Sequence, residues 1–210
     1  LLINLNKVFA PAISKLYANG EIKELNNLYK QTTFIINLLT IPLAVIITIF
    51  ADEILMLYRQ ELVMFKPYLY IMLVGGMVSL AAGSSGTIMV MAGLERENLR
   101  LQSIRAILLI VLSIWLIPIK QMYAVVILYV LFMLFVNISQ LIYLSKRINI
   151  NPFSKPLLTL FFITIPFMLF AINIDYSYEL YHFILLPLII YFIYFSFLYT
   201  LFKGFINDIL

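Results

Sequence analysis

The sequence predicts an all-α fold: a polytopic bundle of helices embedded in a membrane. Of its 210 residues, 64% are hydrophobic and 11% are charged, and the mean hydropathy is +1.04. Soluble domains contain about 25% charged residues. The charges here also lie between long uncharged runs and form no basic patch. The composition therefore excludes a soluble domain, a disordered tail and a nucleic-acid-binding protein.

The uncharged runs predict helices and not barrel strands. A helix needs roughly 20 apolar residues to cross a bilayer, whereas a barrel strand alternates in polarity over about 10 residues. The run that follows Arg105 is apolar on every face as far as Ile117. Interior prolines such as Pro42 and Pro166 are compatible with membrane helices, where they act as kinks.

Six complete spans are expected, preceded by the end of a further helix in residues 1–18 whose beginning lies outside the sequence. The shortest span depends on Arg105 and Lys120 extending outward to the lipid headgroups. The six predicted spans are Thr33–Phe50, Pro67–Met91, Ala106–Ile119, Gln121–Ser145, Pro156–Ile174 and Phe183–Phe202.

The distribution of basic residues predicts the orientation. Alternate connectors carry ten Lys and Arg residues, and the opposite set carries three. Because cytoplasmic loops are enriched in Lys and Arg, we expect the ten-residue set and the C-terminus to be cytoplasmic. Two of these connectors, Gly20–Gln31 and Gly93–Gln102, are expected to be either short interfacial helices or ordinary loops.

The sequence offers little catalytic chemistry. It has no cysteine and one histidine, which excludes disulfides, thiolate sites and multi-histidine metal sites. Asp175 and Glu179 beside His182 are interpreted as a solvated outer loop, in which three tyrosines (176, 178 and 181) anchor the membrane surface. We expect no catalytic residue, no metal and no cofactor.

Polar residues within the spans are the candidates for a substrate path. Gly75, Ser79 and Gly83 recur every four residues, a spacing typical of close helix packing. The serines that follow this stripe, and the amides in other spans, either pack between helices or line a polar path. Lys7 is expected to lie well inside the bilayer, where its ammonium either extends to the surface or faces a wet cavity. The candidate substrate-path residues are Asn4, Lys7, Asn37, Ser84, Ser85 and Asn137.

The order of several segments resembles the polysaccharide-unit (O-antigen type) flippases. These proteins belong to the multidrug, oligosaccharidyl-lipid and polysaccharide exporter superfamily. The resemblance covers about residues 8–150 and depends on order and spacing, not on one diagnostic motif. Its parts are Phe9–Gly20 (FAPAISKLYANG), Glu24-Leu25 and Tyr29, Ile41-Pro42, Gly86–Gly93 (GTIMVMAG) followed by Glu95-Arg96-Glu97, and Trp115–Pro118 (WLIP). The sequence departs from the family after Pro118, where Ile119–Met122 replaces small residues.

The resemblance implies part of the C-terminal lobe of a two-lobe transporter. Residues 1–19 would be the end of a truncated helix, 20–150 second-lobe helices and 151–210 an additional C-terminal pair. The implied activity is alternating-access export of undecaprenyl-pyrophosphate-linked oligosaccharide across the bacterial inner membrane. The implied partners are this substrate, membrane lipids and the missing N-terminal lobe, without nucleic acid. In a transporter for an anionic lipid, Lys7 within the bilayer would be a natural contact for the lipid phosphate.

Two other functions remain open. A drug or cation antiporter of the same superfamily needs an ion-coupling carboxylate within a span, and none of the six predicted spans contains one. A membrane glycan polymerase or ligase typically has a large outer loop rich in Arg and His. The largest outer loop here, Ala51–Lys66, is short and contains one Arg.

Overall fold

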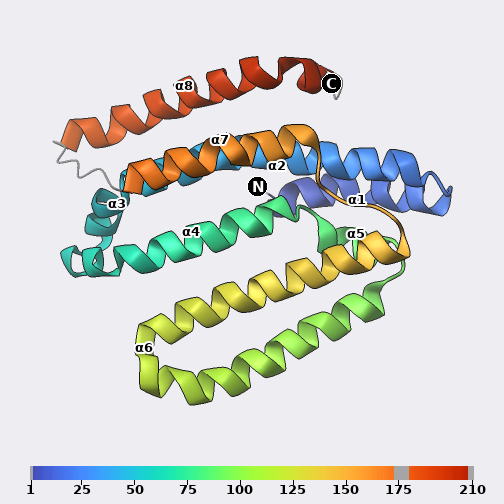
Figure 1. Cartoon of the computed structure of the whole chain (residues 1–210), viewed down its shortest axis with the longest axis horizontal. Helices are drawn as coiled ribbons and strands as arrows, with labels where there is room; N and C mark the ends of the chain where they lie inside the picture. Colours follow the sequence, from blue (N-terminus) through green and yellow to red (C-terminus); the bar gives the residue numbers. More distant parts are fainter. Residues whose placement is uncertain (1, 173–179, 208–210) are drawn as a thin grey trace. The chain divides into compact units, whose positions relative to one another are not determined.

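The computed structural model describes residues 2–172 and 180–207, with side chains for 8–166, 168, 169 and 189–203. No strand occurs in these residues, and nearly all of them are helical (Figure 1), so the predicted all-α fold is confirmed. The elements are α1 (Leu2–Ala18), α2 (Ile22–Ile49), α3 (Ala51–Tyr58), the 3-10 helix η1 (Gln60–Phe65), α4 (Lys66–Ala81), α5 (Ser85–Met91), α6 (Glu95–Arg147), α7 (Lys155–Ile172) and α8 (Leu180–Asn207).

Apolar helical segments dominate the chain. Among the described residues, three such segments are long and apolar enough to cross a membrane, namely Ile22–Ile49, Gln60–Met91 and Glu95–Arg147. Two shorter apolar stretches, Lys155–Pro166 and Ile189–Lys203, lie in α7 and α8. This length and composition indicate a membrane protein.

The helix α6 consists of two arms. Gln121 has φ 48° and ψ −130°, outside the helical region, and the chain reverses direction there (Figure 1). A straight helix of 53 residues would be about 80 Å long, far more than the roughly 30 Å hydrocarbon core. The arms 95–120 and 122–147 each have a length that suits one crossing. The reversal falls where the sequence places the boundary between two predicted spans.

The two polar connectors singled out in the sequence belong to long helices. α2 begins at Ile22 and α6 at Glu95. Most of Gly20–Gln31 and Gly93–Gln102 therefore forms the first turns of α2 and α6. The prediction of separate interfacial helices or loops is wrong, because helix formation continues without a break from the polar turns into the apolar run.

Glycine caps separate these helices from the ones before them. Gly20 and Gly93 have left-handed φ values of 75° and 74°, which glycine adopts without steric strain. The N–H of the residue after each glycine donates to a carbonyl five residues back, the pattern of a Schellman cap. These bonds are Glu21 N to Leu16 O at 2.9 Å and Leu94 N to Met89 O at 2.8 Å. Each cap ends one helix and lets the next begin at once.

The chain forms two compact units. One contains residues 1–36 and 71–153, and the other contains 37–70 and 154–210. The domain boundaries expected from the sequence, after residues 19 and 150, stay predictions.

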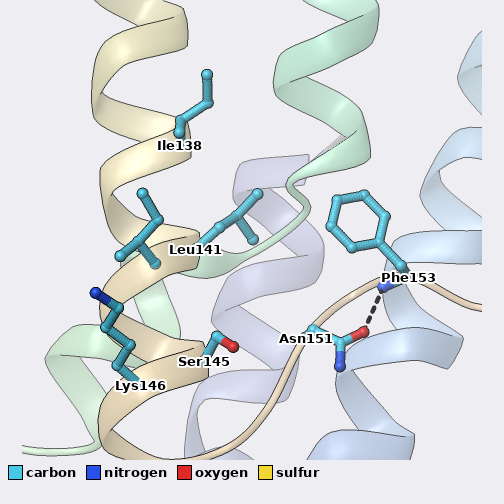
Figure 2. A pocket seen from close by; sticks show the side chains of 7 residues that line it. Ile138, Leu141, Ser145, Lys146, Asn151 and Phe153 are labelled. Atoms are coloured by element: carbon cyan, nitrogen blue, oxygen red, sulfur yellow. Dashed lines mark hydrogen bonds between the residues drawn. The ribbon is translucent and has the colours of Figure 1, made fainter.

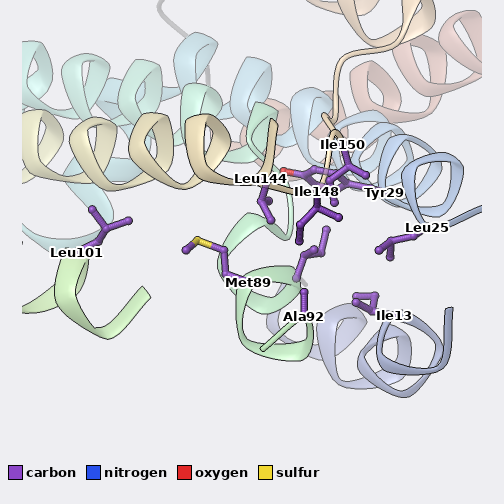
Figure 3. Close-up of a cluster of buried hydrophobic side chains, with 10 residues drawn as sticks. Ile13, Leu25, Tyr29, Met89, Ala92, Leu101, Leu144, Ile148 and Ile150 are labelled. Carbon is purple, nitrogen blue, oxygen red and sulfur yellow. The ribbon is translucent and has the colours of Figure 1, made fainter. Parts of the chain in front are cut away.

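The first unit has an apolar core around the ends of its helices. Tyr29 and Leu25 from α2 are 1% and 0% exposed, and Met89 from α5 is 0% exposed. The cluster (Figure 3) consists of Ile13, Leu25, Tyr29, Ile88, Met89, Ala92, Leu101, Leu144, Ile148 and Ile150. It therefore joins the end of α1, the start of α2, α5 and both ends of α6.

The second unit contains an ion pair. Lys66 Nζ, at the start of α4, donates to Asp52 Oδ2 of α3 at 2.7 Å. Tyr194 of α8 hydrogen-bonds the Thr164 hydroxyl of α7 at 2.7 Å. The carboxylate of Asp52 is thus paired with the ammonium of a lysine from the next long helix.

Candidate polar site at a helix break

A helix break interrupts the predicted span Pro67–Met91. α4 ends at Ala81 and α5 begins at Ser85, and Gly83 between them has φ 59°. In hydrocarbon every freed backbone group needs a partner inside the protein. Tyr29 OH donates to the carbonyl oxygen of Ala82 at 2.6 Å and supplies that partner.

The break is closely packed against α2. Thr33, one turn after Tyr29, is completely buried. A Cβ atom at Gly83 would overlap Thr33 Oγ1. Only glycine therefore suits this position, both for its φ and for the space that Thr33 leaves.

Three buried or half-buried polar side chains are linked in series beside the break. Ser85 Oγ donates to Gln140 Oε1 at 2.8 Å, and Gln140 Nε2 donates to Asn98 Oδ1 at 2.8 Å. Ser85 is 1% exposed and Gln140 is 3% exposed. This polar network connects α5 to both arms of α6. It satisfies groups that would otherwise be costly to bury.

A second polar contact lies one turn away on the same face of α6. Asn137 Nδ2 donates to Ser79 Oγ of α4 at 2.9 Å. Asn137 and Gln140 are three residues apart, so they lie on neighbouring positions of one helical face. This face of the C-terminal arm thus contacts α4 and α5 through two separate amide–hydroxyl hydrogen bonds.

Small residues allow the close approach of these helices. A Cβ at Gly75 would lie 2.8 Å from Val130 Cγ1, and one at Gly86 would lie 3.1 Å from Gln140 Nε2. Gly75 and Ser79 therefore pack against α6, as the packing interpretation of the stripe predicts. Gly83 does not continue the stripe, because it lies in the break and faces Thr33.

The structure brings together some of the candidate substrate-path residues. Ser84 and Ser85 lie at the break and are buried, and Asn137 is half-buried beside Ser79. Asn37 is buried in α2, in the other unit. Asn4 and Lys7 lie in α1, and their side chains are outside the described part, as are those of Asp175, Glu179, His182 and the tyrosines at 176, 178 and 181.

Three members of the site were missed. Tyr29 enters the sequence analysis only within the connector Gly20–Gln31 and the family resemblance, and Asn98 only within the connector Gly93–Gln102. Gln140 could have been identified as a candidate, because it is an amide within the largely apolar run 121–145. Its partner Ser85 lies 55 residues away in the sequence, a pairing that periodicity does not reveal.

The chemistry of this site is that of hydrogen bonding. Its hydroxyls and amides exchange partners readily and carry no charge. Among the described residues, no group of three or more His, Cys, Asp or Glu side chains is placed to hold a metal ion. The network is suited to binding a polar, uncharged ligand group or to joining helices.

Comparisons of the chain with models of known families, with curated proteins and with solved structures find no match. The resemblance to polysaccharide-unit flippases therefore stays a prediction.

Proposed function

We propose that the chain is part of a flippase that moves undecaprenyl-pyrophosphate-linked oligosaccharides across the bacterial inner membrane by alternating access. In this proposal six helices cross the bilayer completely, residues 1–19 end a further one, and the C-terminus is cytoplasmic. Residues 20–150 belong to the second of two lobes and 151–210 to an additional helix pair. The segment order quoted above, from Phe9 to Pro118, supports the family.

The observation that carries the proposal is the helix break at Ala82–Ser84, with its buried polar network. Secondary transporters typically contain discontinuous helices whose interrupted backbone lines a polar site, and the break here has such a polar site beside it. Hydroxyl and amide groups also match the hydroxyl-rich sugar units of the proposed substrate. An uncharged network can open and re-form with a small energy change, because each such bond in a membrane contributes about 0.6 kcal/mol on average.

The test uses the protein that contains this chain, reconstituted in liposomes with a fluorescent undecaprenyl-pyrophosphate-linked oligosaccharide. We expect the labelled lipid to become accessible to an impermeant quencher faster than in protein-free vesicles, without faster exchange of labelled phosphatidylcholine. Gln140→Leu should slow the transbilayer movement of the labelled oligosaccharide lipid severalfold. Ser103→Ala, at an exposed position of α6, should leave that rate unchanged. A rate equal to that of empty vesicles would contradict the proposal.

Lys7 provides a second test of the same function. If its ammonium contacts the substrate phosphate, Lys7→Ala impairs transport and leaves the amount of membrane-inserted protein unchanged. Unchanged transport would remove Lys7 from the path, whereas lost insertion would assign it a structural role.

A further inference from the structure

A groove lies where the C-terminal arm of α6 meets the segment that follows it. Its volume is about 420 Å³, within the roughly 300–1,000 Å³ typical of small-molecule sites. It is lined by Ile138, Leu141, Ile142, Ser145, Lys146, Asn151 and Phe153 (Figure 2). All seven residues belong to the first unit.

The groove has an apolar part and a polar end. Ile138 lies higher on the α6 arm, and Lys146 lies at its end (Figure 2). Eight residues of helix separate them, about 12 Å along the axis. Ser145 and Asn151 accompany Lys146 at the polar end, whereas the apolar wall runs along the helix.

The wall opposite α6 is held in place. Asn151 N donates to Asn26 Oδ1 of α2 at 2.9 Å, and Phe153 N donates to Asn151 Oδ1 at 3.1 Å. Ile150 is 1% exposed and packs in the apolar core. The position of Phe153 against the groove therefore follows from bonds to the body of the unit, so the groove is preformed.

The charge at the polar end is available to a ligand. The one ion pair among the described residues joins Lys66 to Asp52, so Lys146 has no acidic partner there. Lys146 also belongs to the connector set that carries ten of the Lys and Arg residues, the set expected at the anionic cytoplasmic surface.

We propose that this groove binds one anionic phospholipid, with the phosphate at Lys146 and an acyl chain along Ile138, Leu141 and Ile142. The apolar wall runs along the helix axis, which is the direction of an acyl chain in a bilayer. An ammonium at the surface end complements the phosphate, and Ser145 and Asn151 can add hydrogen-bond donors. The proposal depends on membrane insertion but not on the transported substrate.

The test places a reporter in the groove. In a Trp115→Phe background this chain has no tryptophan, and Phe153→Trp then introduces one that lines the groove; any tryptophan elsewhere in the protein is also replaced by phenylalanine. The protein is reconstituted in phosphatidylcholine vesicles that contain increasing fractions of acyl-brominated phosphatidylglycerol or acyl-brominated phosphatidylcholine. Bromine quenches the tryptophan only on contact, so the half-quenching fraction reports occupancy.

We expect half-quenching at an about fivefold lower fraction of phosphatidylglycerol than of phosphatidylcholine, the effect of one lysine near an anionic lipid. Lys146→Ala should remove this preference, and the neighbouring exposed variant Arg147→Ala should retain it. Filling the groove with Ile142→Phe should weaken quenching by both lipids, whereas Ile107→Phe, on the other arm, should not.

Three results would overturn the proposal. Equal quenching by the two lipids shows that the groove does not select an anionic headgroup. Equal losses in Lys146→Ala and Arg147→Ala show general attraction to the charged surface. Displacement of phosphatidylglycerol by millimolar glycerol phosphate shows that the acyl chain contributes nothing and that the site takes a free phosphate.

Discussion

Gln140 is the residue on which the buried polar contacts of the first unit converge. Its amide accepts from Ser85 and donates to Asn98, so it uses both halves of the group at once. In a low-dielectric interior, removal of one member of such a chain leaves the others without partners. The side chain therefore fixes the relation of α5 to both arms of α6.

A double-mutant cycle measures this coupling. We expect Ser85→Ala and Gln140→Leu together to reduce the free energy of unfolding by less than the sum of the single losses, with a coupling of about 0.6–1.7 kcal/mol. The measurement is reversible unfolding in mixed micelles with dodecyl sulfate. Ser79→Ala, which shares no hydrogen bond with Gln140, should add to Gln140→Leu within about 0.5 kcal/mol. Additivity in both cycles would show that the Ser85 contact is energetically neutral.

A comparison of Gly20 with Gly83 separates two energetic costs of adding a Cβ atom, which are backbone strain and steric overlap. Gly20 and Gly83 both have left-handed φ, but a Cβ at Gly20 meets no atom within 4 Å, whereas one at Gly83 overlaps Thr33. Gly20→Ala should therefore lower the free energy of unfolding by about 1–2 kcal/mol through strain alone. Gly83→Ala should lower it by a further 1–3 kcal/mol or so through overpacking. Unfolding in mixed micelles tests both, and equal losses would show that Thr33 moves aside.

At the scale of elements, the lengths of the uncharged runs in the sequence predicted where the apolar helices lie. The thickness of the hydrocarbon core sets the length that such a run needs. The turn in α6 lies at Gln121, beside the Lys120 boundary read from charge. The break at Gly83 was not predicted. A glycine among small residues is equally consistent with close packing, and the choice here depends on Thr33, which approaches from another helix.

The turn in α6 makes its own prediction. Gln121 has φ 48° and ψ −130°, values that glycine adopts readily and that strain a residue with a Cβ. Gln121→Gly should raise the free energy of unfolding, by about 1 kcal/mol or more. The same change at an exposed position within a helical arm, Ser103→Gly, should lower it by about 0.5–1 kcal/mol. Loss of stability in both variants would mean that the turn does not have this backbone conformation.

At the scale of the whole molecule, composition predicted the class of protein, while the contacts of the polar site stayed hidden. The network joins residues such as Ser85 and Gln140 that are distant in sequence, and no local period encodes their pairing. Apolar surface is likewise uninformative for function here, since lipid and other helices cover it equally well. The orientation of the chain, by contrast, is predicted by charge counting and can be measured directly.

Because the chain has no cysteine, single cysteines can report its topology. Arg59 lies on the connector set with three basic residues, and Arg147 lies on the set with ten; both are exposed. Since basic loops remain cytoplasmic, an impermeant maleimide added to spheroplasts should label Arg59→Cys but should label Arg147→Cys only after lysis. Ile107→Cys, within a predicted span, should stay unlabelled in both conditions. Labelling of Arg59→Cys and Arg147→Cys from the same side would contradict alternating spans, and with them the proposed carrier.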